Sequence, residues 1–422
     1  MKRHIISGAM LTAIIMLFLT GISCSSPVNT VQDPHFTEDG QLMKDSTDTV
    51  SFEPITPNRI KFYVEVSGSM NGFFRANRPT VFKRDLWQIM TYCSAIAPTV
   101  SILTNDGASG AEMPQSQFQA YMNTGAFVSS ASTKVPVMLQ GIISALNTTA
   151  GEVAVLVSDM KYSPVGAAAP EVLLTQYSSD INRILGTAGK AVSMVCATSD
   201  YLDNAGNDIA ANQSPYYYLI IGDAMQVADV RNTISSLLQE NGDFIDNIES
   251  GFDYGRPTYS FGIPRNCVQL DDEPTFTNCS DDPNAPCTIR LKIDLQNYRW
   301  LVSDSTELRK AFKVKALYGS TVEVGDISIE TKNITDNVLR RTSTATVELI
   351  VSNMPLESEV LEWTMELPNT DISKMSPFFT NATSENDPTK SFSVLDFIKG
   401  IFHGGIINEN LKPNYILLSK KG

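Results

Sequence analysis

Hydrophobic positions between residues 58 and 250 follow two alternating patterns. Short runs that are apolar almost throughout are followed by segments in which apolar residues recur every three or four positions. The first pattern predicts buried strands, and the second predicts helices packed on them. The predicted strands are 59–66, 99–103, 152–157, 192–197 and 216–221, and the predicted helices are 82–96, 135–146, 173–184 and 227–238. This order indicates an α/β fold with a doubly wound, mostly parallel sheet.

From about residue 251 onward, helical periodicity gives way to alternation of apolar and polar residues. The alternating segments are 289–295, 312–315, 322–324, 327–329, 347–351 and 361–367. Short strands with turn-rich connections are typical of a mainly antiparallel β-sandwich. An amphipathic helix predicted at 394–402 either belongs to this β-rich domain or packs back on the first one. We expect two folded domains, 58–250 and 251–422, which suits a chain of 422 residues.

The first 23 residues have the pattern of an export signal. Lys2 and Arg3 precede an apolar run at 5–19, which is too short for a stable membrane span. Cys24 follows small residues at the end of this run and resembles the lipidated Cys of the bacterial lipoprotein cleavage box, although Gly21 stands where Leu is usual. The alternative is an ordinary secretory signal cut near Ser23. The lipoprotein interpretation implies a membrane anchor at the bacterial cell envelope, at the outer membrane or the cell surface.

Residues 24–57 predict a flexible tether. They are rich in Ser, Thr, Asp, Asn and Pro and have no sustained periodicity. Such a segment would hold the folded domains away from the membrane.

Charge and histidine content narrow the function. The chain carries 32 basic and 46 acidic residues, a formal net charge of −14. This balance argues against nucleic acid as a partner, since phosphate binding needs a basic surface. Only three histidines occur, His4, His35 and His403, which disfavours histidine-based zinc sites and catalytic triads. Hydroxyl and carboxylate oxygens remain as candidate ligands for a hard cation.

Two predicted strand ends carry such oxygens. Ser67, Gly68 and Ser69 follow the strand that ends near Glu65, and Asp159 follows the apolar run 152–157. Mg²⁺ takes about six oxygen ligands and keeps several waters, so hydroxyls and a nearby carboxylate can share it with an incoming ligand. If the Ser-Gly-Ser sequence is only a structural turn, its hydroxyls should cap the following helix.

The segment Glu65-Val66-Ser67-Gly68-Ser69 resembles the Asp-x-Ser-x-Ser box of von Willebrand factor type A domains. The resemblance covers roughly residues 58–250 and implies a metal-ion-dependent adhesion site that holds Mg²⁺ or Mn²⁺, or alternatively Ca²⁺. In that family the two serines bind the cation directly, a Thr from a later loop joins them, and an Asp acts through water. These roles fall on Ser67, Ser69, Thr133 and Asp159, with Ser132 and Ser130 as alternatives to Thr133.

Glu65 departs from the family pattern, which has Asp at this position. Its additional methylene either brings the carboxylate into direct contact with the metal or spoils the site. A directly bound carboxylate would neutralise part of the metal's charge and weaken its attraction for a partner's carboxylate.

Five cysteines remain after Cys24, an odd number for an exported protein. Cys93 and Cys196 fall in a helical and a strand pattern, where free thiols behave as small buried hydrophobes. Cys267, Cys279 and Cys287 share one loop-rich stretch, which predicts one disulfide without revealing the pair. Two other residues have structural interpretations: Asp223 as a helix cap and His403 as a helix C-terminal residue.

These observations predict a lipid-anchored binding protein, not an enzyme, that engages a protein or glycan through a divalent cation. One alternative is a metal-dependent hydrolase of phosphate or sulfate esters, against which stands the lack of ligands for a second metal. The other is a structural subunit of an envelope complex with a degenerate metal site.

Overall fold

The computed structural model describes most of the chain from residue 56 onward. The described residues are 56–97, 99–105, 112–125, 135–162, 170–252, 257–270, 273–296, 298, 305–333, 341–365, 372–381, 387–403 and 413–421. The predicted signal, Cys24, the predicted tether up to residue 55, Thr133, Ser130 and Ser132 lie outside them. Among the described residues, no helix combines the length and the apolar character that crossing a membrane requires.

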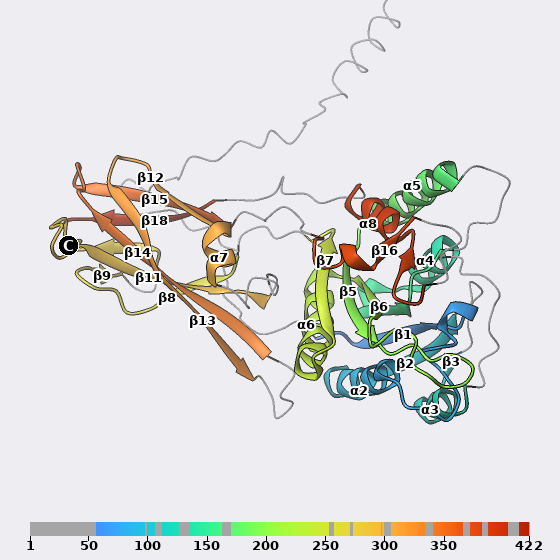
Figure 1. The fold of residues 1–422 in the computed structure, drawn as a ribbon. Helices are drawn as coiled ribbons and strands as arrows, with labels where there is room; N and C mark the ends of the chain where they lie inside the picture. Colours follow the sequence, from blue (N-terminus) through green and yellow to red (C-terminus); the bar gives the residue numbers. More distant parts are fainter. Residues whose placement is uncertain are drawn as a thin grey trace, which may run out of the picture. The chain divides into compact units, whose positions relative to one another are not determined.

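Seven strands form one mixed sheet (Figure 1). They are β1 (Arg59–Glu65), β2 (Thr99–Asn105), β3 (Glu112–Met113), β4 (Glu152–Ser158), β5 (Ala191–Ser199), β6 (Ser214–Gly222) and β7 (Phe244–Ser250). Their order is β3-β2-β1-β4-β6-β5-β7. β1 pairs in parallel with β2 and β4, with unbroken register to β4 from Arg59 to Val64.

The prediction of a mostly parallel sheet is wrong for the other pairings. β3 pairs antiparallel with β2, and β6 lies between β4 and β5 and is antiparallel to both. β7 adds a further antiparallel edge on β5. No helix separates β5 from β6 in the chain, and a parallel pair needs a long crossover connection, so these two strands pair antiparallel.

Helices cover both faces of this sheet. Buried side chains of α2 (Val81–Ile96), α3 (Gln115–Thr124) and α6 (Ala224–Asn241) share a core with Phe62 and Val64 of β1. Tyr63, which points to the opposite face, packs with α4 (Val135–Ala145) and α5 (Pro170–Ala188). The alternation of buried residues along β1 therefore places helices on each side. β4 is buried along its whole length, as its continuous apolar run predicted.

The β-rich region contains two sheets. One has the order β12-β15-β18-β10-β9 and the other β13-β14-β11-β8. The strands are β8 (Tyr259–Phe261), β9 (Val268–Gln269), β10 (Thr275–Thr277), β11 (Cys287–Asp294), β12 (Phe312–Ala316), β13 (Thr321–Asn333), β14 (Arg341–Ser352), β15 (Ser358–Met365) and β18 (Asn414–Ser419). α7 (Ser305–Ala311) precedes β12.

Aromatic side chains join the inner faces of these two sheets. Tyr259 of β8 meets Trp363 of β15 edge to face, and Phe261 of β8 meets Phe276 of β10 in the same way. All pairings in the two sheets are antiparallel except that of β10 with β18. The region is therefore a mainly antiparallel sandwich, as the alternating pattern predicted.

The C-terminal segment returns to the α/β sheet before its last strand joins the sandwich. It contains η4 (Ser376–Phe378), β16 (Phe379–Thr380), β17 (Ser391–Phe392) and α8 (Val394–His403). α8 packs against α5 on the same face as α4, which is the second of the two places expected for it (Figure 1). A Cβ on Gly400 would lie 2.7 Å from Ile181 Cβ and from Ser178 O, so only glycine permits this close approach.

Candidate functional site

The carboxyl ends of β1 and β4 lie side by side and carry the predicted acidic and hydroxyl groups. Val64 is in register with Val157, so Glu65 neighbours Ser158 at the ends of two parallel strands. Ser67 and Ser69 follow β1, and Asp159 follows β4. We call Glu65, Ser67, Ser69, Ser158 and Asp159 the strand-end cluster. Ligands of open α/β sheets bind at such an edge because loops, not strands, occupy it.

The turn after β1 brings two hydroxyls together. Ser67 Oγ lies 2.9 Å from Ser69 Oγ, at the start of the short helix η1 (Gly68–Met70). Ser67 occupies the N-cap position of η1, yet its side chain makes no capping hydrogen bond. The structural role that would explain this serine pair, helix capping, is therefore absent. Both hydroxyl oxygens keep acceptor lone pairs that a cation can use.

Tyr201 holds this turn from the other side. Its hydroxyl donates to the carbonyl oxygen of Ser69 over 3.0 Å. A Cβ on Gly72 would lie 2.3 Å from a Tyr201 ring carbon, so the ring fits only because residue 72 is glycine. Burial raises the pKa of Tyr201, and the negative charge of Asp159 adds to this shift. Asp159 therefore lies close enough to Tyr201 for its charge to be felt there.

Asp159 is a fully buried carboxylate with one oxygen left over. Oδ1 accepts from the backbone N–H of Lys161 over 3.1 Å. Oδ2 is also buried and has no hydrogen-bond partner in the described part of the chain. An ionised oxygen buried without a partner is costly, so such a group calls for a cation or a donor. The Asp159 backbone carbonyl accepts from the Ser391 hydroxyl over 3.0 Å, which connects this site to the returning C-terminal segment.

Glu65 holds the Asp159 turn and is itself buried. Its carboxylate accepts a hydrogen bond from the Ser158 hydroxyl, and Ser158 Oγ accepts from the Met160 N–H over 2.7 Å. Met160 has a φ of 54°, in the left-handed region that non-glycine residues rarely adopt. The chain of bonds from Glu65 through Ser158 therefore fixes the turn that presents Asp159.

The negative charge of Glu65 acts on the face of the sheet that α4 and α5 cover. Burial raises the pKa of Tyr177 on α5 well above its ordinary value, and the charges of Tyr162 and Glu65 contribute further. The influence of Glu65 on a residue of α5 agrees with the alternation along β1, which places Glu65 on the same face as Tyr63. Glu65 is therefore a positioning residue beneath the site.

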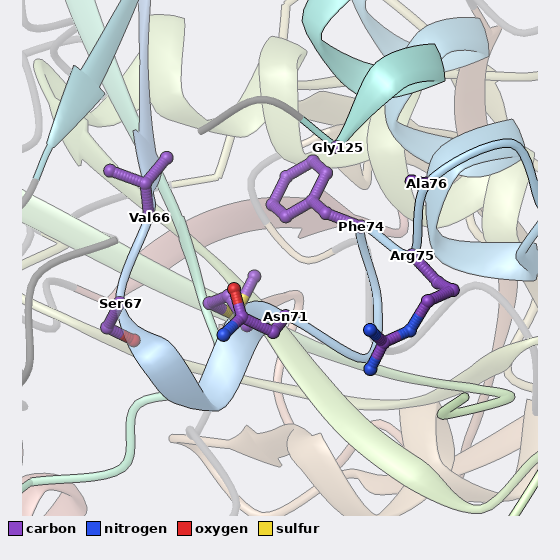
Figure 2. Close-up of a pocket in the computed structure, with 8 residues that line it drawn as sticks. Val66, Ser67, Asn71, Phe74, Arg75, Ala76 and Gly125 are labelled. Carbon is purple, nitrogen blue, oxygen red and sulfur yellow. The ribbon is translucent and has the colours of Figure 1, made fainter. Parts of the chain in front are cut away.

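A cavity of about 250 Å³ opens beside Ser67 (Figure 2). Ser67, Asn71, Phe74 and Arg75 are among the residues that line it. The Arg75 guanidinium donates from Nη2 to the carbonyl of Leu202 over 3.1 Å, while its buried Nε has no hydrogen-bond partner among the described residues. The cavity thus combines a positive charge, an amide and a hydroxyl, which are donors suited to a carboxylate.

Sequence reasoning missed Asn71, Arg75 and Tyr201. Arg75 and Asn71 lie in the turns between η1 and α2, where no periodic pattern marks them. Tyr201 reaches Ser69 across 132 positions of the chain. Because these two residues are so far apart in the sequence, no local motif predicts their contact, which is seen only in the folded structure.

The residues for which the sequence predicted only structural roles have those roles in the fold. Asp223 is the N-cap of α6, and its side chain accepts from the Met225 N–H over 3.2 Å. Cys93 and Cys196 are free and fully buried, and His403 is the last residue of α8.

Among the described residues, one cluster of His, Cys, Asp or Glu side chains has the spacing of metal ligands. It consists of Cys267, Cys279 and Cys287, which belong to the sandwich and not to the strand-end cluster. The shared loop-rich stretch predicted a disulfide within this trio, whereas all three thiols are free in this structure. Comparisons of the chain with protein-family models, with curated proteins and with solved structures find no match.

Proposed function

We propose that this chain is an exported, lipid-anchored binding protein that engages a carboxylate-bearing protein or glycan through a divalent cation at the strand-end cluster. The fold underlying the proposal is a variant of the von Willebrand factor type A arrangement. In its support, β1 lies between two parallel neighbours, a serine-containing turn follows β1, and helices cover both faces of the sheet. The antiparallel β5–β6 pair makes it a variant.

The observation that carries the proposal is the buried Asp159 Oδ2, which has no hydrogen-bond partner among the described residues and follows β4. The adjacent strand β1 is followed by the Ser67–Ser69 hydroxyl pair, in which Ser67 makes no capping bond. Ser67, Ser69 and Asp159 supply the oxygen donors that Mg²⁺ and Mn²⁺ prefer, so the residues present fit such an ion. Thr133 is proposed as a further ligand from the loop before α4. A bound cation would supply positive charge that attracts a carboxylate from the partner.

Arg75 extends this chemistry into the neighbouring cavity. A partner carboxylate held near Ser67 would lie close to the positive charge of the Arg75 guanidinium, which lines the same cavity. Hydrogen bonds between charged donors and acceptors are roughly twice as strong as neutral ones, which would favour acidic partners over neutral ones. Glu65 stays beneath the site and orients Asp159 through Ser158.

Calorimetric titration of Mg²⁺ and Mn²⁺ into the mature protein tests the cation site. We expect binding by the wild type, a loss of at least about tenfold in affinity for Ser67→Ala, and no change for Ser179→Ala, which removes an exposed helix hydroxyl elsewhere. Absence of heat in the wild type, or equal binding by both variants, would contradict the proposal.

A pull-down from envelope extract, with and without chelator, tests the partner. Capture that chelator abolishes, and that Arg75→Ala weakens, supports cation-bridged binding of an acidic group. For the anchor, Cys24→Ser should move the protein from the membrane fraction to the soluble exported fraction.

A second candidate is a structural subunit that docks without metal. The burial of the Glu65 carboxylate under Ser158 favours it, because that carboxylate already has a role within the fold. Co-purification of one envelope partner regardless of chelator, together with silent Mg²⁺ calorimetry, would support this candidate.

A further inference from the structure

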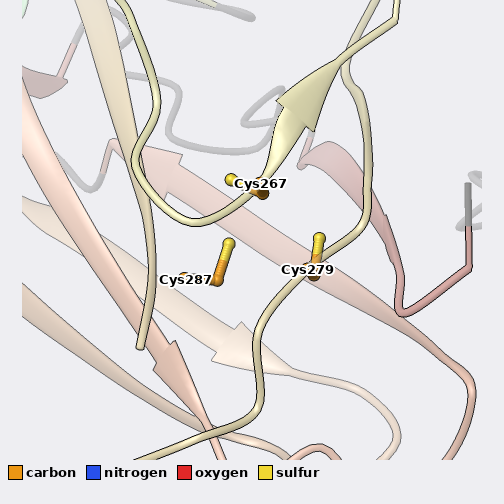
Figure 3. Close-up of side chains that lie close together, drawn as sticks. All are labelled: Cys267, Cys279 and Cys287. Atoms are coloured by element: carbon orange, nitrogen blue, oxygen red, sulfur yellow. The ribbon is translucent and has the colours of Figure 1, made fainter. Parts of the chain in front are cut away.

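Three cysteine side chains of the sandwich converge on one space (Figure 3). Cys267, Cys279 and Cys287, which we call the cysteine triad, have sulfur atoms that all lie within 4.8 Å of one another. Cys279 and Cys287 are buried and Cys267 is partly exposed. Three sulfurs on a tetrahedral zinc ion, with Zn–S bonds of about 2.3 Å, stand about 3.8 Å apart. The triad thus has the spacing of three ligands around one ion.

The backbone turns sharply just before two of the three cysteines. Asn266 and Asn278, which precede Cys267 and Cys279, have φ values of 56° and 52°. Asparagine tolerates this left-handed conformation better than most residues, and at both positions it turns the chain sharply just before a cysteine. The same local geometry therefore recurs at two of the three ligand positions.

Hydrogen bonds connect the three segments to one another. Asn266 Nδ2 donates to the carbonyl of Pro286, the residue before Cys287, over 3.0 Å. The Ser280 N–H donates to the Asn266 carbonyl over 3.0 Å, and the Cys279 N–H donates to the Ser419 carbonyl over 3.0 Å. The residues next to each cysteine are thus held by bonds to another segment. Such supporting contacts orient metal ligands in advance of binding.

The ligand atoms select the class of ion. Soft thiolates bind Zn²⁺ and Cu⁺, whereas Mg²⁺, Mn²⁺ and Ca²⁺ prefer oxygen. The triad has no His, Asp or Glu neighbour at ligand spacing among the described residues, so three thiolates would leave a fourth position of a tetrahedral ion for water. The partial exposure of Cys267 opens the site on its side. A disulfide would use two sulfurs and leave the third without a role.

The structure assigns to Cys267, Cys279 and Cys287 a three-thiolate site for Zn²⁺ that joins the two sheets of the sandwich. Cys267 directly precedes β9 and Cys279 follows β10, both in the five-stranded sheet, while Cys287 begins β11 in the four-stranded sheet. An ion bound to all three would connect the sheets at one end. Its role is structural, and it is independent of the cation site proposed for the α/β sheet.

The test is Zn²⁺ titration of the mature chain, purified under reducing conditions and then freed of reductant. We expect one Zn²⁺ per chain and a rise in melting temperature on binding. Cys279→Ser should lose at least about 100-fold in affinity, since removing a ligand costs more than removing a supporting contact. Cys93→Ala, which removes a buried thiol outside the triad, should keep the affinity of the wild type. Co²⁺ in place of Zn²⁺ should give thiolate-to-metal charge-transfer absorption that Cys279→Ser lacks.

Alkylation followed by mass spectrometry measures whether the triad cysteines are thiols or disulfides in the chain as isolated from its exported fraction. A disulfide between any two members of the triad in that material would overturn the proposal, as would Zn²⁺ affinity that is equal in wild type and Cys279→Ser. Because the readouts are Zn²⁺ stoichiometry and thiol state, silent Mg²⁺ calorimetry leaves this result intact.

Discussion

The strand-end cluster and the cysteine triad gather opposite kinds of donor atom by different means. The strand-end cluster uses oxygens placed by two adjacent parallel strands, so its members follow directly from β1 and β4. The triad uses sulfurs on three segments, linked by backbone and side-chain hydrogen bonds around Asn266. Oxygen donors suit hard cations that keep water and exchange ligands, whereas thiolates bind soft ions. The comparison assigns binding to one region and cross-linking to the other.

The largest expected effect is that each of two variants loses affinity for one metal ion and keeps affinity for the other. Cys279→Ser should lower Zn²⁺ affinity at least about 100-fold and leave Mg²⁺ affinity within about twofold, because the two clusters share no residue. Ser67→Ala should lower Mg²⁺ affinity at least about tenfold and leave Zn²⁺ affinity within about twofold. Paired calorimetric titrations of both ions into both variants measure this. A variant that loses affinity for both ions would contradict the independence of the two clusters.

Asp159→Asn should change stability at the strand-end cluster. The variant removes a buried charge whose Oδ2 has no hydrogen-bond partner in the part of the chain that the structure describes. We therefore expect the metal-free protein to gain about 1–3 kcal/mol in free energy of unfolding. The rise in melting temperature that Mg²⁺ gives the wild type should vanish. Urea unfolding with and without Mg²⁺ measures both effects.

Asp223→Asn is the matched control for Asp159→Asn, because asparagine caps helices as well as aspartate does. A metal-free Asp159→Asn that is less stable than wild type would mean that the carboxylate is already satisfied within the fold.

Asp294 offers a buried carboxylate of the sandwich for which no cation is proposed. Burial raises its pKa from 3.8 to about 6, and the hydrogen bond from the Gln296 N–H offsets this only in part. The folded state therefore binds a proton between about pH 4 and 6 that the unfolded state has lost, so this carboxylate lowers stability as pH rises through that window. Asp294→Asn should remove this loss and add about 2–3 kcal/mol at pH 7.

Urea unfolding at several pH values from 4 to 7 measures the Asp294 effect as the difference between variant and wild type. Asp243, whose pKa burial also raises to about 6, contributes equally to both proteins and cancels. A difference that does not change with pH would show that Asp294 does not titrate in this range.

Tyr201→Phe gives the smallest expected effect. The ring against Gly72 remains. The variant loses the hydroxyl, which donates to the Ser69 carbonyl and also has a hydrogen bond with the Gly72 backbone, at a cost of about 1 kcal/mol. Since that bond holds the serine turn, Mg²⁺ affinity should fall a few-fold and Zn²⁺ affinity should stay unchanged. Calorimetry of both ions decides whether the tyrosine supports the strand-end cluster or only the core.

Local signals predicted much of the α/β region and of the candidate site. A strand pattern marked β1 and a nearly continuous apolar run marked β4, and the residues that follow these strands identified Ser67, Ser69 and Asp159. The same signals missed the short α3 and the partly buried β7, whose polar residues obscure the strand pattern. They also left open the role of Glu65, because the sequence does not tell which side chain its longer carboxylate reaches.

The sequence by itself determined the alternation of strands and helices, the sandwich pattern and the oxygen-bearing strand ends, because periodicity and turn chemistry act over a few neighbouring residues. Only the tertiary structure decided that β6 enters between β4 and β5, that α8 returns to α5, and that Ser391 meets Asp159 across 232 positions. It likewise gathered three cysteines from separate segments. Strand order and contacts between distant segments depend on how the connections close and pack, and no local pattern records that geometry.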